Sequence, residues 1–137
     1  MMAKLQMPTV LLVDDDRITK ELLRSFLRKE NYPVVGEASN GAEAVMRCQL
    51  LKPNIVLLDI NMPQMDGIQA LEEIRRVSPA TMVLMVSADS TLNKVKEALS
   101  KGASGFLVKP LKPASVMDKL RTCWNQKSNK GEPTFEL

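Results

Sequence analysis

Acidic side chains follow two apolar runs of the sequence, at positions where carboxylates could bind a hard cation or act as acid, base or nucleophile. Asp59 ends the run Asn54-Ile-Val-Leu-Leu-Asp59, and the run that begins at Val10 ends in Asp14-Asp-Asp16. Both runs are typical of buried strands. In an open parallel α/β sheet, ligands bind outside the carboxyl ends of the strands. These acids are therefore candidates for chemistry.

Two further apolar runs are followed by other reactive groups: Ser87 follows residues 82–86, and Lys109 follows residues 106–108. The chain has no histidine, which excludes a Ser-His-Asp triad, a Cys-His dyad and any histidine-ligated metal site. Cys48 and Cys123 lie far apart in the sequence, and we expect them to be buried, reduced thiols. Carboxylate, hydroxyl and lysine chemistry remains.

Strand-like runs alternate with helical patterns along the chain, which is typical of βαβ units around a parallel sheet. We predict strands at residues 9–13, 34–35, 55–58, 82–86 and 106–108. The helix predicted at residues 17–30 repeats Ile18, Leu22 and Phe26 every four residues, and a later helix carries a stripe of Leu92, Val95 and Leu99. Pro113 suits the first turn of the last helix. Asp16 and Asp66 are interpreted as helix caps, outside any site.

Length and composition favour one soluble domain. The 137 residues can enclose a hydrophobic core, and 45% hydrophobic with 26% charged residues excludes collagen-like, disordered and disulfide-scaffold classes. The net charge of +3 is scattered, which is weak support for a nucleic-acid partner. The apolar runs are too short to span a membrane, and residues 1–7 lack a signal-peptide core. We expect a cytoplasmic protein with an extension at 1–7, a domain at 8–126 and a polar tail or linker stub at 127–137.

The order of these motifs carries a resemblance to a known family. The acids at 14–15 are followed along the chain by three motifs: Asp59-Ile-Asn-Met-Pro-Gln-Met-Asp-Gly67, Val86-Ser-Ala88 and Val108-Lys-Pro110. Together, the acids and these motifs resemble the receiver domain of two-component response regulators over residues 8–125. The resemblance implies a flavodoxin-like (βα)5 doubly wound fold, an α/β sandwich whose five-stranded parallel sheet has the order 2-1-3-4-5. The first and third strands are then neighbours, so their acids could share one hard cation, and Mg²⁺ is the natural choice.

The same resemblance implies a role for each site residue. Asp59 would be the phosphoacceptor, with Ser87 and Lys109 contacting the phosphoryl group. Asp15, Asp59 and the backbone carbonyl of Asn61 would bind Mg²⁺ directly, and Asp14 would act through bound water. Lys109 would have to span two strands, roughly 10 Å by strand spacing, which only a long side chain can do.

Further residues are expected to modulate or transmit the switch. Asn61 and Asp89 would tune how fast water removes the phosphoryl group, and the small Ala88 would leave its approach open. Pro110 is a candidate for a cis peptide bond. Phe106 would be the aromatic residue that rotates on phosphorylation, and since it lacks the hydroxyl of the tyrosine found in many relatives, its coupling would rely on packing alone.

The resemblance also implies partners. A histidine kinase or histidine phosphotransfer protein would be the donor, and a downstream protein would bind the face formed by the fourth helix, fifth strand and fifth helix, which could also form a homodimer. No contact with nucleic acid or membrane is expected. The chain resembles the single-domain, chemotaxis-regulator type and would be no enzyme beyond its own phosphorylation and dephosphorylation.

Four alternatives stay open to different degrees. The chain could be a constitutive protein-binding module without phosphorylation, or the receiver fragment of a longer regulator. A haloacid-dehalogenase-type phosphatase would need a second Asp at residue 61, where this chain has Asn. A flavodoxin-like flavin carrier would need a phosphate-cradling loop where three carboxylates lie instead.

Overall fold

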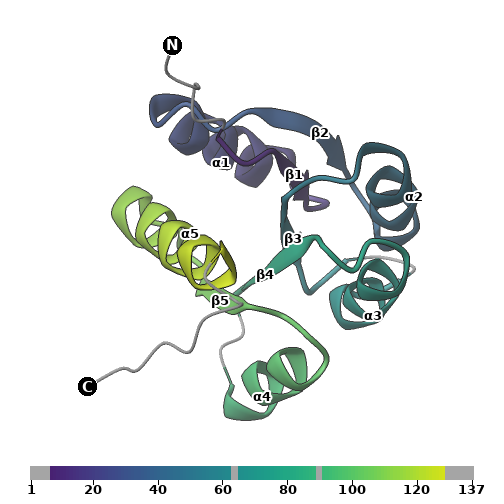
Figure 1. Cartoon of the computed structure of the whole chain (residues 1–137). Helices are drawn as coiled ribbons and strands as arrows, with labels where there is room; N and C mark the ends of the chain where they lie inside the picture. Colours follow the sequence, from purple (N-terminus) through teal and green to yellow (C-terminus); the bar gives the residue numbers. More distant parts are fainter. Residues whose placement is uncertain (1–6, 63–64, 89–90, 129–137) are drawn as a thin grey trace.

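A five-stranded sheet with helices on both faces organises the protein, as seen in a computed structural model (Figure 1). The structure describes residues 7–62, 65–88 and 91–128. All strand pairs are parallel, and the sheet order is β2-β1-β3-β4-β5, which confirms the predicted flavodoxin-like arrangement. Strands and helices alternate along the chain in this order: β1 (Val10–Val13), α1 (Arg17–Lys29), β2 (Val34–Ala38), α2 (Gly41–Leu51), β3 (Ile55–Asp59), α3 (Gly67–Val77), β4 (Met82–Ser87), α4 (Leu92–Ser100), β5 (Gly105–Val108) and α5 (Pro113–Ser128).

Two apolar cores lie on opposite faces of the sheet. One contains side chains of α1 and α5, and the other contains side chains of α2, α3 and α4. In Figure 1, α1 and α5 accordingly lie on one side, with α2 and α3 on the other. The three inner strands β1, β3 and β4 are buried along their whole length, because helices cover both of their faces. Their continuous apolar runs follow from that double burial.

Side-chain caps begin three of the helices. Asp16 accepts a hydrogen bond from the backbone N–H of Ile18 at the start of α1, and Asn40 accepts one from Glu43 at the start of α2. Asp66 forms a capping box with Gln69 at the start of α3. The interpretation of Asp16 and Asp66 as caps is confirmed.

The predicted apolar faces of two helices were wrong in part. Phe26 of α1 is buried as predicted, but Ile18 and Leu22 are exposed, and the helix buries Leu23 and Leu27 with Phe26. A strict four-residue repeat drifts by about 40° per step around a helix, so a residue two repeats from Phe26 leaves the buried face. On α4, Leu92 and Leu99 are 65% and 47% exposed, and the helix buries Ala98. A small residue lets the helix approach the sheet, and the leucines face outward.

Two element bounds differ from the sequence prediction by more than one residue. β2 continues beyond residue 35 to Ala38, through a register shift opposite Val10 and Leu11. It is an edge strand, and Gly36 and Glu37 gave it no apolar signal. α5 continues to Ser128, so the residues at 127 and 128, placed in the tail by sequence, are helical.

The remaining expectations concern thiols and membranes. Cys48 and Cys123 are free and buried, as predicted. Within the described ranges, none of the helices combines the length and apolar character needed to cross a bilayer.

Candidate functional site

The acids at the ends of β1 and β3 meet at one edge of the sheet. Val13 pairs with Leu58, so Asp14 and Asp59 are the next residues on adjacent strands. Both are buried, at 1% and 3% exposure, whereas Asp15 is exposed. One carboxylate oxygen from each of the three lies within 4.8 Å of the others. The sequence reasoning that brought these acids together is consistent with this geometry.

Lys109 reaches this acid group from the far side of β4. It follows β5 directly, and its Nζ lies 3.3 Å from Asp14 Oδ2 and 3.5 Å from Asp59 Oδ1. The extended lysine side chain therefore spans β4, as the strand spacing required. One ammonium thus faces two buried carboxylates.

The charges at this edge are not balanced by Lys109 alone. Burial, and next the charge of Asp14, raise the pKa of Asp59 to about 6, while Lys109 opposes the shift. Burial also raises the pKa of Asp14, against the Asp16 backbone hydrogen bond and Lys109. Burial lowers the pKa of Lys109, but Asp59 and Asp14 outweigh it, so the net shift is upward. The site has excess negative charge that a further cation would neutralise.

The donor set fits Mg²⁺. Asp14, Asp15 and Asp59 supply only hard carboxylate oxygens, and Mg²⁺ is usually held by one or two carboxylates together with waters and phosphate oxygens. The raised pKa of Asp59 agrees with this fit, because a bound divalent cation would offset both the burial and the charge of Asp14 that raise it.

Backbone contacts hold Asp14 in place. Its N–H donates to Ala38 O at the end of β2 (3.1 Å), and its Oδ1 accepts from the N–H of Asp16 (2.8 Å). The first contact ties the acid to the neighbouring strand, and the second ties it to the start of α1. Both the position and the orientation of the carboxylate follow from these bonds.

Gly67 is a positioning residue that sequence reasoning interpreted only as part of a turn. Its N–H donates to Ile60 O (2.7 Å), and a Cβ at this position would lie 2.4 Å from the carbonyl oxygen of Asp59 and 2.5 Å from Ile60 Cα. Only glycine lets the start of α3 approach the end of β3 this closely. The Asp66-Gly67 pair in the sequence indicated a turn, but not this contact.

The other predicted site residues lie around this edge. Ser87 ends β4 and is fully buried, and its carbonyl accepts the N–H of Lys109 (2.9 Å). Ala88 and Asn61 are exposed, each just beyond a strand end. The Lys109–Pro110 peptide bond is cis. Phe106 lies on β5, half-buried against the core on the α2, α3 and α4 side. Asp89 lies outside the described residues.

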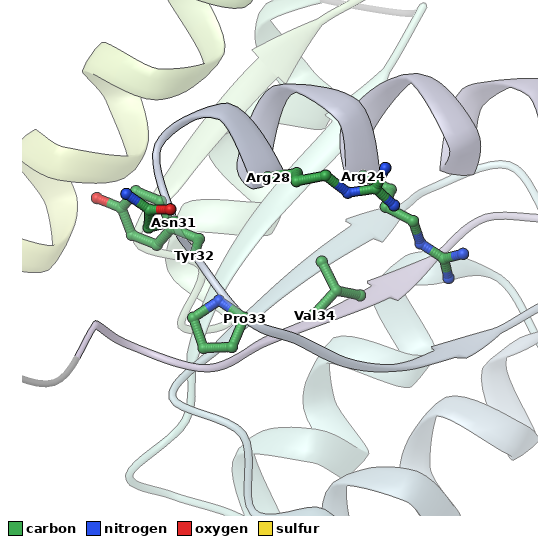
Figure 2. A pocket seen from close by; sticks show the side chains of 6 residues that line it. All are labelled: Arg24, Arg28, Asn31, Tyr32, Pro33 and Val34. Atoms are coloured by element: carbon green, nitrogen blue, oxygen red, sulfur yellow. The ribbon is translucent and has the colours of Figure 1, made fainter.

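A pocket elsewhere on the molecule contains no comparable chemistry. It is lined by two arginines of α1, by the turn that follows the helix and by the first residue of β2, namely Arg24, Arg28, Asn31, Tyr32, Pro33 and Val34 (Figure 2). The acids lie at the N-terminal end of α1, whereas this turn lies at its C-terminal end. Arg24 already pairs with Glu37. The pocket is not part of the acid site.

Comparison with known proteins assigns the family. Residues 10–121 match the response regulator receiver domain. The chain belongs to this family. It is 42% identical over 111 residues to the chemotaxis protein CheY of Thermotoga maritima, covering 81% of this chain and 92% of that protein. It is 40% identical over 111 residues to CheY of Listeria monocytogenes, covering 81% of this chain and 93% of that protein.

A solved relative gives the same assignment by structure. The CheX–CheY–BeF3–Mg²⁺ complex of Borrelia burgdorferi matches with a TM-score of 0.81 and 37% identity, covering 83% of this chain and 87% of that one. Receiver domains are signalling switches, so the family is consistent with phosphorylation-dependent signalling. The receiver domain of this chain is of the CheY type.

Proposed function

We propose that this chain is a phosphorylation-activated switch of a two-component phosphorelay, in which Asp59 accepts a phosphoryl group from a histidine kinase or histidine phosphotransfer protein. One observation carries the proposal: a buried Asp59 lies in a group of three carboxylates within 4.8 Å, with Lys109 Nζ 3.5 Å from its oxygen. A carboxylate so placed can act as nucleophile toward phosphorus.

The transfer exchanges one bond for another. An Asp59 oxygen forms a bond to phosphorus as the phosphorus–nitrogen bond of the donor imidazole breaks, and the electron pair of that bond leaves with the imidazole. With a pKa of about 6, Asp59 is mostly ionised at neutral pH and so retains its nucleophilic oxygen. Lys109 would turn from the two carboxylates to a phosphoryl oxygen, and Ser87 would donate to another.

The acids supply the metal site in this proposal. Asp15, Asp59 and the backbone carbonyl of Asn61 would hold Mg²⁺, with Asp14 acting through bound water. When bound there, Mg²⁺ neutralises the charge on the transferring phosphoryl oxygens. Asn61, Ala88 and Asp89 would control the approach of the water that later removes the phosphoryl group.

The output would be a changed binding face. Phosphorylation adds charge and acceptor oxygens beside Ser87, which ends β4, and Lys109, which follows β5. In the chain, α4 connects these two strands. Leu92, Leu99 and Val108 are exposed apolar residues of α4 and β5, and they offer a contact surface for a downstream protein or a second copy of this chain. Phe106 on β5 would transmit the change by packing.

The partners follow from the family. A solved CheY relative was crystallised with CheX, which supports a protein rather than a nucleic acid as the target of this chain. We propose a cytoplasmic switch that contacts neither nucleic acid nor membrane. It would act on no separate substrate and catalyse only its own phosphorylation and dephosphorylation, with residues 8–126 as the functional domain.

Intact-mass measurement with acetyl phosphate tests the proposal. We expect wild type to gain one phosphoryl group in the presence of Mg²⁺, and none after chelation or in Asp59→Asn. The matched control is Asp66→Asn, because Asn also caps helices and this residue lies outside the site. If wild type gains no phosphoryl group under conditions that label a known receiver domain, a constitutive binding module is the better interpretation.

A further inference from the structure

A buried lysine outside the acid site connects α1 to the end of β2. Lys20 on α1 is only 7% exposed, and its Nζ lies 2.8 Å from Ser39 Oγ and 4.0 Å from Glu37 Oε1. Lysine is seldom buried unless its charge is paired, since removing an ammonium from water is costly. Its partners lie at the carboxyl end of β2, on the edge of the sheet that carries the acids.

The contacts of Lys20 connect the two segments that hold Asp14. One of those segments is β2, whose Ala38 O accepts the N–H of Asp14 and is followed directly by Ser39. The other is the start of α1, where the N–H of Asp16 donates to Asp14 Oδ1. Lys20 lies one turn into the same helix, and its own N–H donates to Asp16 O. The contacts therefore close a ring from Asp14 through α1 to β2 and back.

The surrounding acids strengthen this ring. Glu37 also pairs with Arg24 of α1, so a second cation of the helix contacts the same strand. The backbone N–H of Ser39 donates to Glu43 Oε1 of α2 (2.7 Å). The segment that Lys20 contacts is thus also held by a hydrogen bond to α2.

We propose that Lys20 is a positioning residue for Asp14: by joining α1 to Ser39 it holds the backbone groups that orient the Asp14 carboxylate toward the cation and Lys109. This inference rests on the proposed function of the acid site as a Mg²⁺ site. Asp14 would itself act on the cation through bound water, and losing a group that acts from outside the direct ligands typically lowers metal affinity by about 10-fold to 100-fold.

The test compares Lys20→Met with Lys52→Met. Methionine keeps an apolar stem of similar length but removes the ammonium. Lys52 is the control for removal of a lysine charge: it is exposed, and its Nζ donates to Val77 O (2.8 Å) at the C-terminal end of α3, away from the acids. We expect Lys20→Met to weaken Mg²⁺ binding about tenfold in a calorimetric titration, and Lys52→Met to leave it unchanged.

Amide hydrogen exchange of the metal-free protein gives a readout independent of Mg²⁺. The N–H groups of Asp14 and Asp16 should exchange faster in Lys20→Met than in wild type, relative to the N–H groups of β4. A merely structural role would raise exchange in β4 by the same factor, which would overturn the proposal.

A second pair of variants covers the case in which Lys20→Met fails to fold. Ser39 is an exposed residue, so Ser39→Ala should fold, remove the acceptor and accelerate exchange at Asp14, whereas Ser39→Thr keeps the hydroxyl and should match wild type. Equal exchange at Asp14 in both Ser39 variants would contradict the ring. Absence of Mg²⁺ binding in wild type would instead refute the proposed function, while normal Mg²⁺ binding by folded Lys20→Met would refute only this inference.

Discussion

Asp59 carries a buried negative charge that opposes folding when no metal is bound. Its pKa in the folded protein is about 6, above its ordinary value of 3.8, so the folded state holds this proton more tightly than the unfolded chain does. The contribution of Asp59 is thus most favourable at low pH and is lost as the pH rises from about 4 to about 6. At neutral pH the ionised group has its full destabilising effect.

Asp59→Asn should therefore stabilise the metal-free protein. We expect the free energy of unfolding at pH 7 to increase by about 1–3 kcal/mol, and the difference from wild type to shrink toward pH 4. Urea unfolding at several pH values measures both. Asp66→Asn should follow wild type throughout, and a less stable Asp59→Asn at pH 7 would contradict the charge account.

Lys109 stabilises the metal-free protein, whereas ionised Asp59 destabilises it, because the Lys109 ammonium lies beside the carboxylates of Asp14 and Asp59. Lys109→Met should lower the free energy of unfolding by about 1–3 kcal/mol, since it leaves buried carboxylates unpaired. It should also bind Mg²⁺ more tightly, because the ammonium no longer competes.

Saturating Mg²⁺ should abolish most of the stability difference between Lys109→Met and wild type. Calorimetric Mg²⁺ titration and urea unfolding with and without the metal check these outcomes. Lys112→Met, which alters an exposed lysine nearby, is the control. Weaker Mg²⁺ binding by Lys109→Met would show that the ammonium supports the metal site rather than competing for it.

At the scale of elements, the distance between β3 and α3 depends on Gly67. In Gly67→Ala the added Cβ would meet backbone atoms of Asp59 and Ile60, which cannot move as a flexible side chain can. We expect a loss of about 1–3 kcal/mol in the free energy of unfolding and slower phosphorylation of Asp59.

Gly36→Ala is the matched comparison for Gly67→Ala. Its Cβ would lie 3.1 Å from Leu51 Cδ1 and 3.2 Å from Leu11 Cδ1, both ends of side chains that can adjust. Thermal unfolding and the rate of phosphoryl uptake distinguish the two variants. Equal losses in both would mean that the contact at Gly67 has no special role.

Some features of the elements could be predicted from the sequence. The strand ends were predictable because β1, β3 and β4 are buried on both faces and so form unbroken apolar runs that stop at Asp14, Asp59 and Ser87. Lys109 was predictable as the residue that follows a strand-like run, but its reach across β4 to the acids followed only from the sheet order that the family supplied.

Other features had no clear local signal. β2 is an edge strand whose Glu37 is held by cations of α1, so polar residues continue it where the pattern had ended. Lys20 lies on the buried face of α1 with Leu23, and no local pattern predicts a buried lysine, because its partners Ser39 and Glu37 lie in and after another element, β2. The approach of Gly67 to Asp59 depends on a contact between two elements, and no spacing within either one reports it.

For the whole molecule, the proposed switch requires that events at Asp59 reach the exposed leucines of α4. Phe106 packs on the core from β5, next in the sheet to the strand that ends at Ser87. Phe106→Ala should therefore still take up one phosphoryl group at Asp59 but lose the response of α4.

Amide chemical shifts measured before and after adding beryllofluoride with Mg²⁺ check this coupling. In wild type, we expect the changes to extend from the acid site through β4 and β5 to α4, and in Phe106→Ala to stop at the strand ends. Trp124→Phe is a control substitution of an aromatic residue on the opposite face of the sheet. Unchanged shifts at α4 in wild type would contradict the proposed output face.

The position of the phosphoryl group is the most direct test of the central claim. After incubation with acetyl phosphate and Mg²⁺, borohydride reduction converts an aspartyl phosphate to homoserine, which peptide mass spectrometry can locate. We predict homoserine at residue 59 and at none of the neighbouring acids, with no conversion when Mg²⁺ is chelated. Conversion at Asp14 or Asp15 instead, or none in protein that binds Mg²⁺, would contradict the assignment of Asp59 as the phosphoacceptor.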